Sequence, residues 1–371
     1  MMLYRIDFRI LPIICCLMVI SLLIISSMTG GGEADSMTFW TPLVKTQLRW
    51  FCLGWGAFFS IALFDYRKLR DWSLFLYIIM VLLLLGLFFV SPIQNVHRWY
   101  RIPGVASFQP SEEAKLVVII FLSWFFERRG SNIGTFSSAL QTGLIAGIPF
   151  LLILKQPDLG TALVLFPIAL SMGYFAKIHQ GVLRLLMGTS LIVISVGSLL
   201  FSGILSHEKM RPFFTTFMKE YQYERFNACS YHQKAAQTAI AVGGLTGTGW
   251  GKSEFSGRKW LPMAHTDSVF AAIGEEFGFL GIVFLLFLFY ALIYFSFQVA
   301  VVAKDPFGRF LAAGLAAYLA MHVLVNCAMM CALLPISGVP LIFVTYGGSS
   351  LLTTMAALGL LQSIYSRRFM F

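Results

Sequence analysis

Long apolar runs alternate with short polar segments along most of this chain. A helix needs roughly 20 apolar residues to cross the hydrocarbon core of a bilayer, and helices satisfy their own backbone hydrogen bonds there. We therefore predict an all-α, polytopic membrane protein that forms a single transmembrane domain over residues 1–371. The ten expected spans lie near residues 9–28, 48–65, 72–90, 112–127, 139–154, 159–175, 184–202, 269–299, 308–333 and 347–366. The eighth is long enough to tilt or to project beyond the bilayer.

Composition supports this class and excludes several others. Hydrophobic residues make up 58% of the chain and charged residues only 12%, against about 25% charged in soluble domains. We find no P-loop and no dinucleotide fingerprint, so no nucleotide cofactor is expected. The cysteines show no disulfide or zinc-site spacing. No basic patch interleaved with aromatic residues points to nucleic acid.

The basic residues in the short loops predict the orientation. Ten spans place both termini on one side, and the basic short loops fall on that same side, which the positive-inside rule makes cytoplasmic. The segment from about 203 to 268, before the eighth helix, then forms a large extracytoplasmic loop. We interpret the net charge of +10 as a signal of topology and of membrane lipids. The basic residues concerned are Arg67, Lys68, Arg70, Arg128, Arg129, Lys304, Arg309, Arg367 and Arg368.

Asp267 is the most informative polar residue, because it stands where a polar segment meets a long apolar helix. His265 and Thr266 precede it, and Glu275 and Glu276 follow two to three turns deeper. A carboxylate at hydrocarbon depth costs about 2.5–3.5 kcal/mol on insertion scales. Such a group is retained when it is paired, hydrated or functional, and the sequence alone does not choose among the three for the two glutamates.

Two further extracytoplasmic segments carry candidate polar residues. In the loop 94–116, Ser111 is expected to cap the following helix, and Glu112 and Lys115 lie three apart on one helix face. In the turn 155–161, Asp158 either caps the next helix or belongs to a site. In the alternative interpretation, Glu112 is only a first-turn acid that interacts favourably with the helix dipole and pairs with Lys115.

A fourth segment, residues 333–352, is broken by Pro and Gly before the last span and includes Ser349. Non-helical backbone at membrane depth is tolerated where it lines a cavity. We therefore expect the four segments to converge on one extracytoplasmic site for an anionic, lipid-linked substrate. The residue types leave open whether the protein moves that lipid or reacts with it. The cations suited to its phosphates are Arg98, Arg101, Lys115, Arg258 and Lys259.

Asp267 is an acidic residue in a predicted site where cations predominate. A carboxylate there can take a proton from a sugar hydroxyl. It can also hold a divalent cation, Mg or Mn, against a pyrophosphate. Asp267 is therefore our candidate both for catalysis and for binding metal.

Five segments of this chain resemble signature motifs of the SEDS family, in the family's order and across almost the whole chain. They read RWYRIPGVASFQPSEEAK, KQPDLGTAL, GGLTGTGWG, LPMAHTDSVFAAIGEEFGFLG and LLPISGVPLIFVTYGGSSLL. The resemblance is to the elongation-type branch more than to the division-type branch. It implies a peptidoglycan glycosyltransferase of the bacterial cytoplasmic (inner) membrane. Such an enzyme polymerises lipid II into β(1→4) glycan strands outside the membrane, alongside a class B penicillin-binding protein that crosslinks the nascent glycan chain.

The resemblance also assigns roles to residues. Its HTD motif makes Asp267 the catalytic group, with His265 beside it. Arg98, Glu112, Lys115, Asp158 and Ser349 fall in its other motifs and are expected to bind substrate. Three positions depart from the family pattern: Ser268 replaces phenylalanine, Gln237 replaces a lysine and Met263 replaces an acid.

Two other functions fit the same pattern. A flippase for lipid II would need polar residues along the whole crossing, whereas here they cluster on the outside. A non-catalytic scaffold would leave Asp267 dispensable. For the partner's single membrane helix, the expected surface is the eighth and ninth spans, because the ninth is rich in Ala and Gly, which let membrane helices approach closely.

Overall fold

Helices dominate the computed structural model, which describes residues 6–30, 38–90, 98–102, 106–201, 211, 231–256 and 260–369. Each of the ten predicted spans coincides with one long helix, so the predicted all-α membrane fold is confirmed. The long helices are α1 (Ile10–Gly30), α2 (Pro42–Leu63), α3 (Lys68–Gly86), α4 (Pro110–Arg129), α5 (Phe136–Lys155), α6 (Leu159–Phe175), α7 (Gln180–Phe201), α11 (Val269–Val302), α12 (Pro306–Met330) and α13 (Gly348–Ser366). A shorter helix, α10 (Tyr231–Gly243), lies within the predicted extracytoplasmic loop, most of which is outside the described residues.

The helices begin where the sequence supplies capping residues. Thr41 accepts a hydrogen bond from the Val44 N–H at the start of α2, and Asp305 accepts one from Gly308 at the start of α12. A proline follows each cap, where its missing N–H costs nothing. Among the described residues, six helices are long and apolar enough to cross a membrane by themselves. The 17-residue α6 is a shorter apolar helix.

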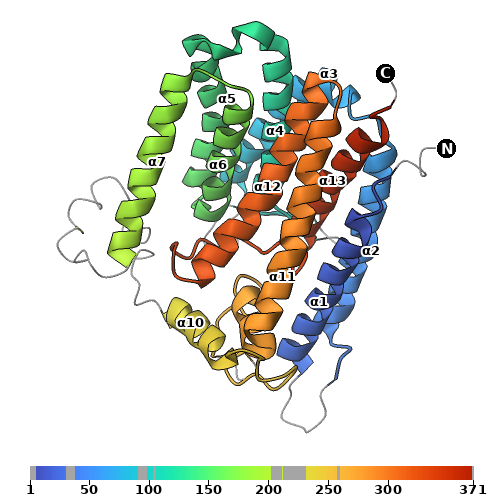
Figure 1. Cartoon of the computed structure of the whole chain (residues 1–371), viewed down its shortest axis with the longest axis vertical. Helices are drawn as coiled ribbons and strands as arrows, with labels where there is room; N and C mark the ends of the chain where they lie inside the picture. Colours follow the sequence, from blue (N-terminus) through green and yellow to red (C-terminus); the bar gives the residue numbers. More distant parts are fainter. Residues whose placement is uncertain are drawn as a thin grey trace.

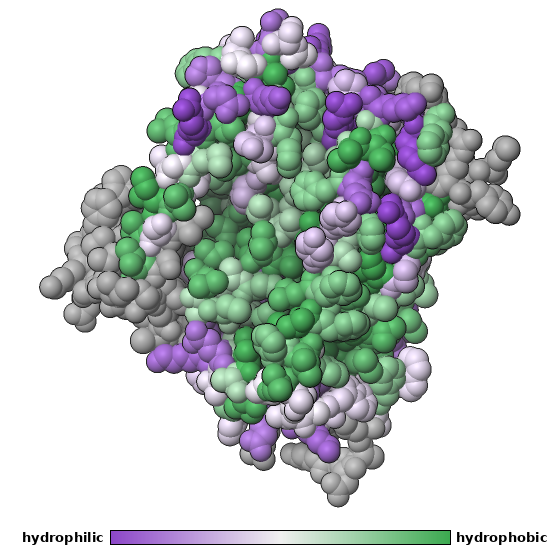
Figure 2. All heavy atoms as spheres, viewed as in Figure 1, coloured by the Kyte–Doolittle hydropathy of each residue, from purple (hydrophilic) through white to green (hydrophobic). Residues whose placement is uncertain are grey.

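The bundle has a buried centre and an apolar outer surface. In α12, 72% of the most apolar stretch is buried, because its Ala and Gly residues pack against α4, α6 and α11. By contrast, α3 and α7 expose apolar side chains. Figure 2 shows a hydrophobic zone across the middle of the visible face, with hydrophilic residues towards the two ends. This distribution is that of a protein surrounded by lipid.

The start of α1 and the end of α13 lie at one end of the bundle, and α10 lies at the other (Figure 1). The backbone N–H of Asp7 donates to Gln362 Oε1 at 2.8 Å, which ties these two chain segments together. The even number of spans predicts this arrangement. The short connections that carry the predicted basic residues are at the same end.

The long helix α11 is broken at Gly278, whose φ of 64° and ψ of −163° are non-helical. A Cβ at Gly278 would lie 2.4 Å from the Gly247 nitrogen, so only glycine fits. The loop after α10 packs into the break: the Phe279 N–H donates to the Gly244 carbonyl at 2.9 Å. The first nine residues of α11 therefore form a separate short segment, directly after Asp267.

Glu275 and Glu276 anchor this loop. Glu275 accepts hydrogen bonds from the N–H groups of Phe255 and Ser256, at 2.7 and 3.0 Å. Glu276 accepts from the hydroxyls of Ser253, at 3.2 Å, and Ser27. Both buried carboxylates thus accept hydrogen bonds from the loop, and Glu276 Oε2 has no hydrogen-bond partner among the described residues. They hold the loop against α11 and α1.

The segment before α4 differs from the prediction in two respects. Residues Tyr100–Ile102 (β1) and Ala106–Phe108 (β2) form a small antiparallel hairpin where only a loop was predicted. The prediction that Ser111 caps α4 is wrong, because the helix begins at Pro110 and Gln109 is the cap residue. The fixed φ of Pro110 suits the first helical position, so the helix starts before the serine. The Ser111 hydroxyl instead donates to Asp158 at 3.0 Å.

Candidate functional site

A polar cavity of about 600 Å³ lies at the end of the bundle where α4, α6, α11 and α13 begin. All four predicted polar segments contribute to its wall. Five predicted site residues line it: Arg98, Glu112, Asp158, Asp267 and Ser349. Lys115 and His265 do not line it. The fold thus brings together residues that are up to 251 positions apart in the sequence, from Arg98 to Ser349.

Asp267 lies in the turn before α11, half-buried and facing this cavity. A Cβ placed on Gly338 would be 3.4 Å from Asp267 Oδ2, so the broken segment before α13 passes directly beside the carboxylate. Gly338 has a φ of 75°, which other residues adopt with strain. The turn and the segment therefore form one wall of the cavity.

Asn326, a residue that the sequence analysis did not single out, joins these two pieces of backbone. Its Nδ2 donates to the Asp267 carbonyl at 3.1 Å and to the Val339 carbonyl at 2.7 Å. The side chain is fully buried in α12. An amide and an imidazole four residues apart, Asn326 and His322, in an otherwise apolar span were the signal that could have found it.

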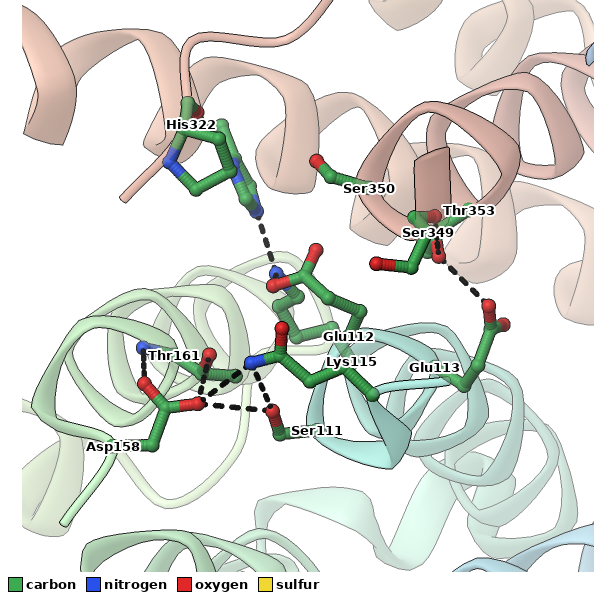
Figure 3. A network of polar contacts seen from close by, with 12 residues as sticks. Ser111, Glu112, Glu113, Lys115, Asp158, Thr161, His322, Ser349, Ser350 and Thr353 are labelled. Atoms are coloured by element: carbon green, nitrogen blue, oxygen red, sulfur yellow. Dashed lines mark hydrogen bonds and ion pairs between the residues drawn. The ribbon is translucent and has the colours of Figure 1, made fainter. Parts of the chain in front are cut away.

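A buried network lies behind the Glu112 wall (Figure 3). The predicted pair is formed, with Lys115 Nζ 2.8 Å from Glu112 Oε1. Lys115 is fully buried, and its Nζ also lies 2.9 Å from Nε2 of His322. An ammonium group can only donate. His322 Nε2 therefore accepts, and its Nδ1 carries the proton, which faces the Pro340 carbonyl at 3.4 Å.

Glu112 connects this network to the cavity. Its second oxygen, Oε2, is buried and has no hydrogen-bond partner within the described part of the protein. A buried, unpaired carboxylate oxygen is costly, so this atom is suited to meet a donor on a bound molecule. Lys115 therefore acts through Glu112, which it holds in place through their ion pair, instead of contacting the contents of the cavity.

Asp158 caps α6, which is one of the two alternatives predicted for it, and it also lines the cavity. It accepts hydrogen bonds from the N–H and hydroxyl of Thr161, at 3.4 and 2.9 Å, and from Ser111 at 3.0 Å (Figure 3). Arg98 Nη1 lies 4.0 Å from Asp158 Oδ1. The same guanidinium donates to the carbonyls of Gln156, at 3.4 Å, and Pro157. The turn before α6 thus fixes a cation at the rim.

His265 supports the wall from behind. Its carbonyl accepts a hydrogen bond from the Tyr346 N–H at 2.9 Å, and the two rings meet edge to face with centroids 6.2 Å apart. Burial lowers the pKa of His265 below its ordinary value, so the ring is neutral at pH 7. Tyr346 itself lines the cavity, as does Ser349 in the first turn of α13.

The three positions that depart from the family pattern have different surroundings. Ser268 is buried, with its hydroxyl 3.0 Å from the Pro262 carbonyl and 2.5 Å from His232 Nε2. Gln237 is exposed on α10, and Lys234, one turn earlier, supplies a cation on the same face. Met263 is exposed.

Three predicted cations are not characterised by the structure: Arg258 and Lys259 lie outside the described residues, and only the backbone of Arg101 is described. No group of three His, Cys, Asp or Glu side chains able to hold a metal ion occurs among the described residues.

The chain resembles known proteins over nearly its whole length. Residues 2–368 match the family of cell cycle proteins FtsW, RodA and SpoVE. The chain is 32% identical to the peptidoglycan glycosyltransferase MrdB of Escherichia coli K12, covering 98% of this chain and 94% of that protein. The crystal structure of the rod shape determining protein RodA from Thermus thermophilus superposes with a TM-score of 0.70, at 25% identity and 98% coverage of both chains. A chain of a peptidoglycan synthase complex, described as coordinating polymerization and crosslinking, gives 0.75 at 24% identity and 99% coverage of both.

Proposed function

The chain belongs to the FtsW, RodA and SpoVE family, and from this premise we propose that its polar cavity is where lipid II is polymerised into glycan. The protein is a multi-pass membrane enzyme, a peptidoglycan glycosyltransferase of the RodA type. The observation that carries the proposal is the convergence of Asp267, Arg98, Glu112 and Asp158, from three separate segments, on one cavity.

Asp267 is the proposed general base. The acceptor lipid II places its terminal sugar 4-hydroxyl against the Asp267 carboxylate, which takes the proton as the oxygen attacks the anomeric carbon of the donor. The new C–O bond forms as the bond from that carbon to the pyrophosphate breaks, and the lipid pyrophosphate leaves with the electron pair. Attack opposite the leaving group inverts the anomeric carbon and gives a β(1→4) linkage. A general base typically contributes about 10²–10⁴-fold in rate.

The donor is the growing glycan strand, anchored through its lipid pyrophosphate. Arg98, fixed at the rim by the turn before α6, is the proposed phosphate contact, because a guanidinium can donate two parallel hydrogen bonds. Glu112 Oε2 is placed to accept from a sugar hydroxyl or amide. The carboxylates in the wall would hold a divalent cation only together with pyrophosphate oxygens, which is how Mg²⁺ is commonly bound.

We infer that the cavity opens on the extracytoplasmic face. The positive-inside rule assigns the end with the chain ends and the basic short connections to the cytoplasm. Lipid II must then be supplied at the outer face by a separate translocation step.

Purified protein incubated with lipid II tests the proposal. We expect gel-resolved glycan strands, with the highest yield when a cognate crosslinking partner is present. Absence of polymer under both conditions, from protein that is monodisperse, would contradict polymerase activity. Transfer of fluorescent lipid II across vesicle membranes without polymer would favour the flippase, the alternative from another class. The division-type homologue FtsW is the alternative within the family.

A class B penicillin-binding protein is the proposed partner, and α11 is its proposed surface. Of the two spans considered, α12 packs mainly inside the bundle, whereas α11 turns Phe284 and Phe287 outwards. We expect photoreactive groups at these two positions to capture the partner's membrane helix. The same group at Phe75, an exposed position on α3, is the control. Capture from Phe75 but not from α11 would place the interface elsewhere.

Replacing Asn326 by alanine should slow polymerisation by at least about tenfold while the protein still folds. The change removes the two hydrogen bonds that hold the Asp267 turn against residue 339, each worth about 0.5–1.5 kcal/mol. Steady-state kinetics on lipid II measure it, and the fall should be mainly in kcat. Asn326→Gln, which keeps the amide, is the matched variant and should retain more activity. Equal activity of Asn326→Ala and wild type would exclude a positioning role.

A further inference from the structure

A second cavity, of about 550 Å³, lies at the opposite end of the bundle, between the start of α1, the end of α11 and the end of α13. Arg9 just before α1, Gln298 in α11 and Arg368 just after α13 line it, together with Tyr294 and Tyr365. The glycosyltransferase site is at the other end, where α11 begins, so this cavity serves some other purpose. Its position beside the chain ends puts it at the membrane surface on the side proposed above to be cytoplasmic.

Arg9, Gln298 and Arg368 leave donors available to a ligand. Arg9 uses Nε and Nη2 in two 2.8 Å hydrogen bonds to Asp7, and its guanidinium carbon lies 4.6 Å from the centroid of the Phe295 ring. Arg368 Nη1 donates to the Tyr365 carbonyl at 2.8 Å, and its other guanidinium nitrogens make no hydrogen bond within that region. The Gln298 amide likewise makes none there. The cavity therefore offers guanidinium and amide donors to a ligand.

The charge of the cavity is positive. Asp7 balances Arg9, and Arg368 has no acidic partner among the described residues. The guanidinium of Arg368 instead stacks 3.5 Å from the centroid of the Tyr365 ring, which holds it in a fixed orientation. Among the residues that the structure describes, no carboxylate lines the cavity. A ligand that uses these donors and neutralises this charge must carry an anionic group such as a phosphate.

One side of the wall is apolar and exposed. It is formed by Phe297, Val301 and Val302 near the end of α11, and 82% of Val301 is exposed. A free phosphate ion would gain nothing from this surface, whereas a hydrocarbon chain would cover it. Basic pockets between transmembrane helices on the cytoplasmic side are suited to anionic lipid headgroups.

We propose that this cavity binds an anionic phospholipid of the adjacent leaflet, with the phosphate at Arg368 and Arg9 and an acyl chain along the end of α11. The headgroup ester and glycerol oxygens lie within reach of the Gln298 amide. The lipid joins the first, eighth and last spans at a point where the chain ends meet. This proposal does not depend on the polymerase reaction.

Lipid retention tests the proposal directly. The intact protein is reconstituted in vesicles of equal parts phosphatidylglycerol and phosphatidylethanolamine, extracted in detergent, and its bound lipids are counted by native mass spectrometry. We expect wild type to retain phosphatidylglycerol in preference to phosphatidylethanolamine. Arg368→Gln should retain about fivefold less of it, the factor associated with one arginine at an anionic surface. Arg184→Gln, which changes an exposed arginine at the start of α7, should behave as wild type.

Two further measurements distinguish a bound lipid from other possible occupants of the cavity. Excess inorganic phosphate should leave the retained phosphatidylglycerol in place, and a photoreactive group at Val301 should crosslink to lipid. Gln298→Leu gives a second, uncharged variant that should also lower retention if Arg368→Gln fails to fold. Equal retention by Arg368→Gln and Arg184→Gln, no preference for phosphatidylglycerol in wild type, displacement by phosphate, or capture of a protein helix at Val301 would each overturn the proposal.

Discussion

Asp267→Ala is expected to abolish glycan polymerisation, with a loss of at least about 10²–10⁴-fold, while the protein remains folded. The carboxylate is the one proposed proton acceptor for the attacking hydroxyl, so no other group in the cavity replaces it. The backbone carbonyl that Asn326 holds is unchanged by the substitution. A gel-resolved polymer assay on lipid II measures the loss, and size-exclusion chromatography reports folding.

Two matched variants sharpen this prediction. Asp267→Asn keeps the shape of the side chain and removes the base, so it should be as inactive as Asp267→Ala. Glu254→Ala removes an exposed acid from the loop before α11 and should leave activity unchanged. Full-length glycan from a well-folded Asp267→Ala protein would remove Asp267 from the mechanism and favour the scaffold alternative.

Lys115→Ala is expected to destabilise the protein strongly as well as to impair polymerisation. It would leave the Glu112 carboxyl without its ion-pair partner and His322 without its donor, both fully or nearly fully buried. Breaking a buried ion pair by removing one partner costs about 3–5 kcal/mol. The protein is heated to a series of temperatures and analysed by size-exclusion chromatography. The temperature at which half of it has left the monodisperse peak should fall clearly. Lys155→Ala, at an exposed lysine, is the control and should not change it.

The double variant Glu112→Gln, Lys115→Met separates stability from function. It removes both charges together, so it should recover much of the stability lost in Lys115→Ala, because replacing a whole buried pair is far less costly than breaking it. It should remain poorly active if the Glu112 carboxylate contacts substrate. A thermal midpoint for Lys115→Ala equal to that of wild type would contradict the buried network. Arg258→Ala should cost less activity than Lys115→Ala.

The local relations within the site followed from the sequence. Glu112 and Lys115 are three apart in a helix and could only be neighbours, and Asp158 stands where a helix must be capped. Ser111 shows the limit of such reasoning, since the adjacent Pro110 competes for the start of the same helix and prevails.

The sequence by itself determined the ten long helices, the placing of both chain ends at one end of the bundle, and the four segments that line the polar cavity. The physical reason is that a bilayer permits only helices of a certain apolar length, and that these properties are local. The tertiary structure alone decided that His322 meets Lys115 across 207 positions and that Asn326 joins two loops. It also decided that α11 breaks at Gly278, where another loop inserts its backbone. These features depend on which distant backbone groups come into contact, and that is fixed only when the helices pack.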